Sequence, residues 1–244
     1  MPTRPMGVAV TWARWSPTWA TAELTPVEQE RVACAVTPAA RRRSVLRALV
    51  VRHAAARALG VAAGSVDVDR TCADCGKQHG RPRVIGSGID ISDSHAPGTI
   101  LVAIGMGGLV GVDVQPTAEG AEIWVRKEAV LKCDGVGLRV HPSAVSVSTA
   151  LEPPVLQSYP ARPAFPDRLW LADLVTPFRG LTAALAVDPG PKGDAPVVGG
   201  AHVLRPDLSI SGPIPQGPWS AAATRARRVR QDITERETAC TWSG

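Results

Sequence analysis

Length, composition and charge describe an ordinary globular chain. The sequence has 244 residues, of which 45% are hydrophobic and 20% charged, and its formal net charge is +5. These values exclude a largely disordered chain and allow one or two domains with a sizeable core. The excess of positive charge favours anionic partners, such as phosphates, acidic proteins or nucleic acids.

Neither a membrane span nor a disulfide framework is expected. No run of about eighteen apolar residues occurs, and the N-terminus lacks the apolar core and cleavage pattern of a signal peptide. The five cysteines are an odd number without such a signal, which argues against structural disulfides. We therefore expect a cytoplasmic monomer that does not bind membranes.

The first part of the chain predicts one strand and two helices. Apolar and small residues alternate over Val8–Trp12, which favours a strand. Thr25 followed by Pro26 is a typical helix start, because threonine caps the first turn and proline fits its first position. A second helix is predicted over 39–59, where apolar residues recur about every 3.6 positions, and Gly60 should end it.

The middle of the chain predicts mainly strands around one further helix. Gly107 and Gly108 form a turn signal between two apolar runs. Gly135 should stop a helix over 124–134. The predicted strands are 66–69, 100–106, 109–114, 144–148, 169–174 and 181–187.

The segment from Trp124 to Lys132 carries the most specific chemical pattern. On a helix, Glu128 and Lys132 lie about one turn apart on the same face. A carboxylate beside an ammonium suits chemistry on a phosphate, because one holds a cation or takes a proton while the other neutralises oxygen charge. Such a pair in isolation is usually an exposed ion pair. Here Asp113 lies upstream in an apolar run and His95 in a short turn, which favours a phosphate site.

These segments together resemble the 4′-phosphopantetheinyl transferases of the Sfp type. The family pattern has a serine–histidine turn, here Ser94-His95, and a strand reading G-[IV]-D-[IV]-E, here 111–115. A W-x-x-K-E-A-x-x-K helix follows, here 124–132, and then G-x-G-L, here 135–138. The pieces occur in the family's order, and the resemblance covers roughly residues 24–188.

The resemblance implies an enzyme that transfers the phosphopantetheine arm of coenzyme A to a serine of an apo acyl or peptidyl carrier protein, releasing 3′,5′-ADP. It implies a magnesium ion held by Asp113, Gln115 and Glu128, with Glu128 also helping to deprotonate the serine. Lys132 would stabilise charge at the reacting phosphates, and His95 would bind a coenzyme A phosphate. Oxygen ligands and cationic side chains are what magnesium-assisted phosphate chemistry requires.

The resemblance implies four further residues at coenzyme A. Arg43 and Ser44 stand at a helix start, where guanidinium groups and the helix N-terminus both favour phosphate. Arg81 stands in Gly80-Arg81-Pro82, where the family has G-K-P, and Ser94 precedes His95. A Ser/His/Asp hydrolase is rejected, because no G-x-S-x-G elbow occurs and adjacent side chains of a strand diverge.

Two departures from the family pattern leave alternatives open. Gln115 replaces a glutamate ligand and removes one negative charge, and the connection 116–123 replaces a much longer segment where the family docks its carrier protein. One alternative is a degenerate relative that binds coenzyme A with little transfer. Another is a basic nucleic-acid-binding module that uses Arg41–Arg43 and the arginines of 225–230, although no nucleic-acid motif supports it.

Cys72, Cys75 and His79 make up part of a zinc motif. The C-x-x-C pair supplies two thiolates and His79 a third ligand, whereas a structural zinc ion has four. No second C-x-x-C follows. We therefore favour a reduced loop or a redox-labile cysteine pair over a metal site.

The order of elements fits the architecture that the resemblance implies, an α+β pseudo-dimer of two similar α/β halves with the active site in the cleft between them. The N-terminal half, 1–105, would bind coenzyme A, and the C-terminal half, 106–188, would carry the metal and the catalytic helix. From 189 onward the pattern fails, so 189–244 is expected to be a disordered tail with at most one helix, over 221–237. Trp124 is expected to anchor the catalytic helix.

Overall fold

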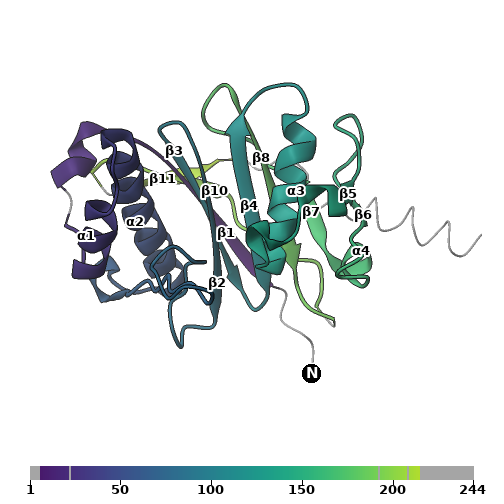
Figure 1. Cartoon of the computed structure of the whole chain (residues 1–244), viewed down its shortest axis with the longest axis horizontal. Coiled ribbons are helices and arrows are strands. Elements are labelled where there is room, and N and C mark those ends of the chain that lie inside the picture. The colour runs from purple at the N-terminus through teal and green to yellow at the C-terminus, as the bar shows by residue number, and fades with distance from the viewer. Residues whose placement is uncertain (1–5, 22, 192, 208, 215–244) are drawn as a thin grey trace, which may run out of the picture.

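The computed structural model describes residues 6–21, 23–191, 193–207 and 209–214. These residues form a mixed α+β fold (Figure 1). The described helices include none that is both long and apolar enough to cross a lipid bilayer. The α-helices are α1 (Pro26–Ala33), α2 (Pro38–Leu59), α3 (Ala121–Asp134) and α4 (Phe165–Arg168), and short 3-10 turns are η1 (Pro17–Thr21), η2 (Ala63–Ser65), η3 (Gly137–Arg139) and η4 (Pro142–Ala144).

The larger sheet has its strands in the order β11-β10-β1-β3-β2, and β9 also pairs with β1. Strand β3 runs antiparallel to both β1 and β2, while β9 and β10 run parallel to β1. The strands are β1 (Gly7–Arg14), β2 (Ile89–Ala96), β3 (Thr99–Met106), β9 (Val197–Val198), β10 (Ala201–Leu204) and β11 (Ile210–Ile214).

A three-stranded sheet with the order β4-β8-β7 follows in the chain, and a small pair, β5 and β6, lies beyond it. Strand β8 runs antiparallel to both β4 and β7. The two main sheets share one pattern of three strands. In the larger sheet β1 precedes the helices α1 and α2, and β3 pairs between β1 and β2. In the smaller sheet β4 precedes α3, and β8 pairs between β4 and β7. The strands are β4 (Leu109–Pro116), β5 (Ser146–Val147), β6 (Leu156–Ser158), β7 (Trp170–Asp173) and β8 (Leu181–Asp188).

Three apolar clusters hold the layers together. The first lies between the two main sheets and includes Trp12 of β1 and Val112 of β4. The second packs α2 against the other face of the larger sheet, around Leu49 and Val102. The third packs α3 against β7 and β8, around Val130. The helices α2 and α3 therefore cover the outer faces of the two sheets (Figure 1).

Side chains join β2 to β4 where the two sheets meet. The backbone N–H of Val110 donates to Asp90 over 2.8 Å, and that of Val112 donates to the Ser92 hydroxyl over 3.0 Å. The N–H of Val114 donates to the Ser94 hydroxyl over 3.3 Å. Because alternate residues of a strand share a face, the three acceptors of β2 form one row along β4. The row fixes the position of the three-stranded sheet against the larger sheet.

The helix predictions are confirmed in most details. The Thr25 side chain accepts from the N–H of Glu28 in a complete capping box, and Pro26 is the first residue of α1. The left-handed residue Gly60 ends α2, with φ of 69°. Gly135 ends α3 in the same way, but the helix begins at Ala121, three residues earlier than predicted.

Two strand predictions and part of the tail prediction need correction. Residues 66–69 contain no strand, and only Asp69 forms an isolated bridge, to Arg83. Of 144–148, only Ser146–Val147 is extended in β5. The segment 189–214 was predicted as tail, yet it supplies β9, β10 and β11, because apolar residues such as Ala201 and Leu204 are buried against β1. The rest of the predicted tail, including the helix over 221–237, lies outside the described residues.

Candidate functional site

A close approach of two backbones places α3 on β4. A Cβ atom on Gly111 would lie 2.0 Å from the carbonyl oxygen of Ala129 and 2.3 Å from the amide nitrogen of Cys133. Only glycine therefore allows the strand and the helix to approach this closely. The approach brings the helix face that carries Glu128 and Lys132 beside Asp113, two residues further along β4.

The carboxylate of Asp113 is the centre of a compact polar cluster. Its Oδ1 atom lies 2.5 Å from the ammonium of Lys132 and accepts a hydrogen bond of 2.6 Å from the Ser94 hydroxyl. Its Oδ2 atom accepts from the amide of Gln115 over 3.1 Å. Asp113 is only 2% exposed. We call Asp113, Glu128, Lys132, Ser94 and Gln115 the Asp113 cluster.

Glu128, the second acid of the cluster, has one carboxylate oxygen without a hydrogen-bond partner among the described residues. This oxygen, Oε1, is buried. Desolvation raises the pKa of Glu128, and the negative charge of Asp113 raises it further, against the opposing charge of Lys132. Two carboxylates that share a site with an unpartnered oxygen form a donor set that suits a hard divalent cation.

A cavity of about 650 Å³ adjoins the cluster between α2 and the ends of β2 and β4. We call it the His95 cavity. Arg42, Arg43 and His95 line it on the cationic side, and Gln115 links it to the Asp113 cluster. Trp15 and other apolar residues complete its wall: Ala39, Leu46, Ala96, Pro97 and Ile100. Its size and mixed lining suit a small molecule that carries both anionic and apolar groups.

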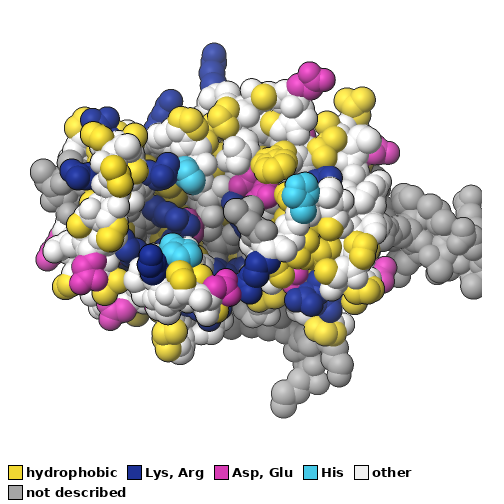
Figure 2. All heavy atoms as spheres, in the orientation of Figure 1, with side chains coloured by type: hydrophobic (Ala, Val, Ile, Leu, Met, Phe, Trp, Pro, Cys, Tyr) yellow, Lys and Arg dark blue, Asp and Glu magenta, His cyan; other side chains and the backbone are white. Residues whose placement is uncertain are grey.

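His95 lies within reach of several positive charges. Partial desolvation lowers the pKa of His95, and the charges of Arg43, Arg47 and Lys132 lower it further. Figure 2 shows Lys, Arg and His side chains gathered on this face of the molecule. An anion bound among them would receive positive charge from both α2 and α3.

Three predicted coenzyme A residues have other surroundings. Ser94 is buried and its hydroxyl supports Asp113, so it does not reach the cavity wall. Ser44 is not among the described residues that line the His95 cavity. The Arg81 guanidinium bonds to Asp90, to the Lys132 carbonyl and to the Val110 carbonyl, so it ties β2, β4 and α3 together.

A buried ion pair beside the cluster was missed by the sequence analysis. Asp93 accepts from Arg47 and, over 2.8 Å, from Arg70. Burial alone would raise the pKa of Asp93, but the charges of Arg70 and Arg47 hold it well below its ordinary value. Asp93 and Arg47 line a second cavity of about 620 Å³, which also touches Lys132. Arg47 follows Arg43 by one helical turn, a spacing that could have identified it; no comparable signal marks Asp93.

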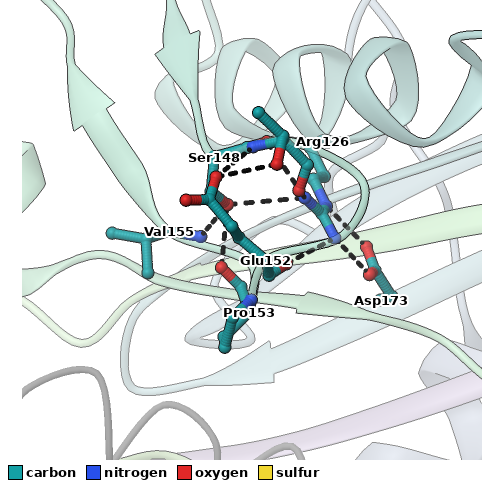
Figure 3. Close-up of polar contacts among 7 residues, drawn as sticks. Arg126, Ser148, Glu152, Pro153, Val155 and Asp173 are labelled. Atoms are coloured by element: carbon teal, nitrogen blue, oxygen red, sulfur yellow. Dashed lines mark hydrogen bonds and ion pairs between the residues drawn. The ribbon is translucent and has the colours of Figure 1, made fainter.

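The anchor of α3 is Arg126 and not Trp124, which is 47% exposed. The Arg126 side chain is buried and forms two bonds to Asp173 of β7, over 2.9 and 2.6 Å (Figure 3). It also donates to the Ser148 carbonyl over 3.0 Å, and the Ser148 hydroxyl donates to the Pro153 carbonyl (Figure 3). This network holds the helix rigidly two residues before Glu128.

Comparison with known proteins assigns no family. The chain matches no description of a known protein family, and no curated protein is significantly similar to it. The geometry of the candidate site is therefore the basis for any functional conclusion.

Proposed function

We propose that the protein is a magnesium-dependent transferase that moves the 4′-phosphopantetheine arm of coenzyme A to a serine of an apo acyl or peptidyl carrier protein. The observation that carries the proposal is the meeting of Asp113, Glu128 and Lys132 beside a cationic cavity. The resemblance of segments 94–95, 111–115 and 124–138 to the Sfp-type transferases supports the same assignment. The repeated strand–helix–strand–strand order of the two sheets supports a pseudo-dimer with the site between its halves.

The Asp113 cluster fits the magnesium ion that this reaction uses. Asp113 and Glu128 would hold the ion, with Gln115 beside them, because both carboxylates face one site and one oxygen of Glu128 lacks a partner among the described residues. When bound, magnesium neutralises negative charge on the pyrophosphate of coenzyme A.

Each remaining residue has a separate task. Glu128, whose pKa is raised by desolvation, takes the proton of the carrier serine as its oxygen attacks the phosphorus atom. Lys132 neutralises charge on the phosphate oxygens as the bond to the leaving 3′,5′-ADP breaks. Arg43, Arg42 and His95 hold the other phosphates of coenzyme A in the His95 cavity.

A mass measurement tests the transfer directly. Protein, coenzyme A, Mg²⁺ and an apo carrier are mixed, and the carrier should gain the mass of one phosphopantetheine group. Glu128→Gln and Asp113→Asn should each lower the rate by about 10²–10³-fold, because electrostatic stabilisation supplies most of this catalysis. Glu30→Gln, an exposed acid of α1, is the matched control and should keep the rate. Full activity of either cluster variant would refute the assigned roles.

Binding of coenzyme A can be tested apart from transfer. Arg43→Gln should weaken calorimetric affinity about tenfold or more, since it removes a charge-assisted contact to phosphate. Arg57→Gln, an exposed arginine near the other end of α2, should leave the affinity unchanged. Equal affinity of the two variants would remove the His95 cavity as the coenzyme A site.

One observation favours a second candidate, a relative that binds coenzyme A with little transfer. Strand β4 ends at Pro116 and α3 begins at Ala121, so four residues make the whole connection. In the family that the chain resembles, the corresponding segment contains a helix at which the carrier docks. Coenzyme A binding that depends on Arg43, without modification of any of several carriers, would establish this candidate.

A further inference from the structure

The loop between η2 and β2 brings three metal-binding side chains together. The sulfur atoms of Cys72 and Cys75 and a ring nitrogen of His79 all lie within 4.8 Å of one another. The Cys75 sulfur is 2.9 Å from Nε2 of His79. The two cysteines are free, so both thiols are available as ligands. Two thiolates and an imidazole form a ligand set that prefers zinc to magnesium or calcium.

The backbone of the loop is folded around the Cys72 sulfur. The N–H groups of Asp74 and Cys75 donate hydrogen bonds to this sulfur. The N–H of Gly76 donates to the Cys72 carbonyl over 2.9 Å, and the N–H of Cys72 donates to the Lys77 carbonyl over 2.8 Å. Gly76 has φ of 70°, which lets the chain turn back after Cys75. The ligands are thus presented by an ordered turn.

The loop has little else to stabilise it. None of residues 71–79 is buried, so the hydrophobic effect contributes little here. Gln78 bonds to Thr71 over 2.8 Å, and the bridge between Asp69 and Arg83 closes the base of the loop. A metal ion that joins Cys72, Cys75 and His79 would supply the cross-link that a hydrophobic core supplies elsewhere.

We propose that Cys72, Cys75 and His79 bind one zinc ion, with an oxygen of Asp74 or of a water molecule as the fourth ligand. The Asp74 carboxylate is 4.0 Å from the Cys72 sulfur, close enough to complete the set after a small shift. Binding replaces the S–H protons of both cysteines, so two protons are released for each zinc ion and no atom is oxidised. Its ligands are distinct from those of the proposed magnesium site, although Cys72 and His79 line the same cavity as Lys132. The proposal does not depend on the proposed function.

The zinc ion stabilises the position of Arg81. The N–H of Gly80 donates to the Arg70 carbonyl over 2.7 Å, directly after His79. The next residue, Arg81, bonds to the carbonyl of Lys132 and to the carbonyl of Val110. Zinc in the loop therefore fixes Arg81, whose side chain joins the end of α3 to β4.

Metal analysis of the whole chain, purified without a histidine tag, tests the site. We expect about one zinc per chain after gel filtration, and zinc X-ray absorption should show two sulfur ligands at about 2.3 Å. Cys75→Ser and His79→Gln should lose the retained zinc, while Cys34→Ser and Cys240→Ser, which change cysteines outside the three ligands, should retain it. Zinc well below one per chain, an absorption spectrum without sulfur, or a mass lower by two hydrogen atoms without metal would overturn the proposal. The last result would show a Cys72–Cys75 disulfide instead.

Hydrogen exchange tests the structural role without any substitution. Removal of zinc from the wild-type chain by a strong chelator should speed amide exchange in residues 70–83 by at least tenfold and leave the centre of α2 unchanged. Exchange in 70–83 that is unaffected by the chelator would overturn the role assigned to the metal. Coenzyme A binding and transfer are not used as readouts, so a failure of this proposal is distinguishable from a failure of the proposed function.

Discussion

The carboxylate of Asp113 and the ammonium of Lys132 lie 2.5 Å apart, although the first belongs to β4 and the second to α3. The Asp113 side chain is 2% exposed and that of Lys132 is 27% exposed. The pair therefore joins a strand to the helix packed on it, and it fixes the carboxylate and the ammonium next to each other beside the His95 cavity.

Lys132→Met should destabilise the protein by about 1–3 kcal/mol, because the buried carboxylate of Asp113 loses its cation. The loss is smaller than for a fully buried pair, because Lys132 is partly exposed to solvent. Urea denaturation measures the loss. Lys127→Met, which lies on another face of α3 and in none of the ion pairs of the described residues, is the control and should change little. In a double-mutant cycle, Asp113→Asn should cost less in the Lys132→Met background than alone. Additive losses would show that the pair does not interact.

Glu128→Gln should stabilise the metal-free protein at neutral pH. Desolvation raises the pKa of Glu128, so the folded protein binds this proton more tightly than the unfolded chain does. Stability therefore falls as pH rises from the ordinary value of 4.5 through the raised pKa, and glutamine removes that loss. We therefore expect a higher Tm for Glu128→Gln than for wild type at neutral pH.

Thermal unfolding of wild type and Glu128→Gln at pH 4 and at pH 7.5, without metal, checks this difference. The gain should be present at pH 7.5 and absent at pH 4. Under the proposed function, Mg²⁺ should raise the Tm of wild type more than that of the variant. If Glu128→Gln is less stable than wild type at pH 7.5, desolvation does not raise the pKa of Glu128.

Under the proposed function, coenzyme A should bind more tightly as the pH falls below the ordinary His95 pKa of 6.5. Desolvation and neighbouring cations lower the pKa of His95, so the imidazole is neutral at pH 7 and gains its charge only in more acidic solution. Calorimetric affinity measured from pH 5 to pH 7.5 should show a slope that His95→Gln removes. His141→Gln, an exposed histidine after η3, should keep it. Identical slopes in wild type and His95→Gln would exclude contact with the phosphates.

Gly111→Ala should destabilise the fold by about 1–3 kcal/mol or more, because the added methyl group meets backbone atoms that cannot rotate away. Gly64→Ala, where a Cβ meets nothing within 4 Å, is the control. Chemical denaturation gives the stability of both. Under the proposed function, the transfer assay should also show slower transfer by Gly111→Ala, because α3 is displaced. A fully stable Gly111→Ala protein would mean that the strand and helix can separate at no cost.

Asp93→Asn should cost about 3–5 kcal/mol at neutral pH, since Arg70 is left buried without its ionised partner. Arg70 and Arg47 hold the pKa of Asp93 below its ordinary value of 3.8, so the ionised form contributes stability above that pH. The contribution is lost as pH falls through the lowered pKa. Urea unfolding at pH 7 and pH 2 should therefore show a smaller difference from wild type at pH 2. The exposed Asp67→Asn is the control, and an unchanged stability of Asp93→Asn at pH 7 would contradict the buried pair.

Local signals were strong enough to predict the helices and several strands. Thr25, Gly60 and Gly135 act within one turn of their own helix, so their roles can be read without knowledge of the fold. The strands β9 and β10 were missed because their four or fewer residues carry no period of their own, and pairing with β1, and for β10 also with β11, makes them regular.

The candidate site could be predicted in part. The proximity of Glu128 and Lys132 follows from their spacing on α3, and their meeting with Asp113 was expected from a resemblance. The tasks of Ser94 and Arg81 depend on partners about nineteen and twenty-nine positions away along the chain, which no local pattern reveals. The same holds for Asp93, whose two arginines come from α2 and from a loop.

The row of bonds between β2 and β4 makes the border of the two sheets unusually sensitive to single substitutions. Most neighbouring strands are joined by main-chain groups, which survive the exchange of any side chain. Here the acceptors belong to Asp90, Ser92 and Ser94 themselves. The Ser94 hydroxyl accepts from the Val114 amide and donates to the Asp113 carboxylate. A movement of that carboxylate therefore also changes the distance between β2 and β4.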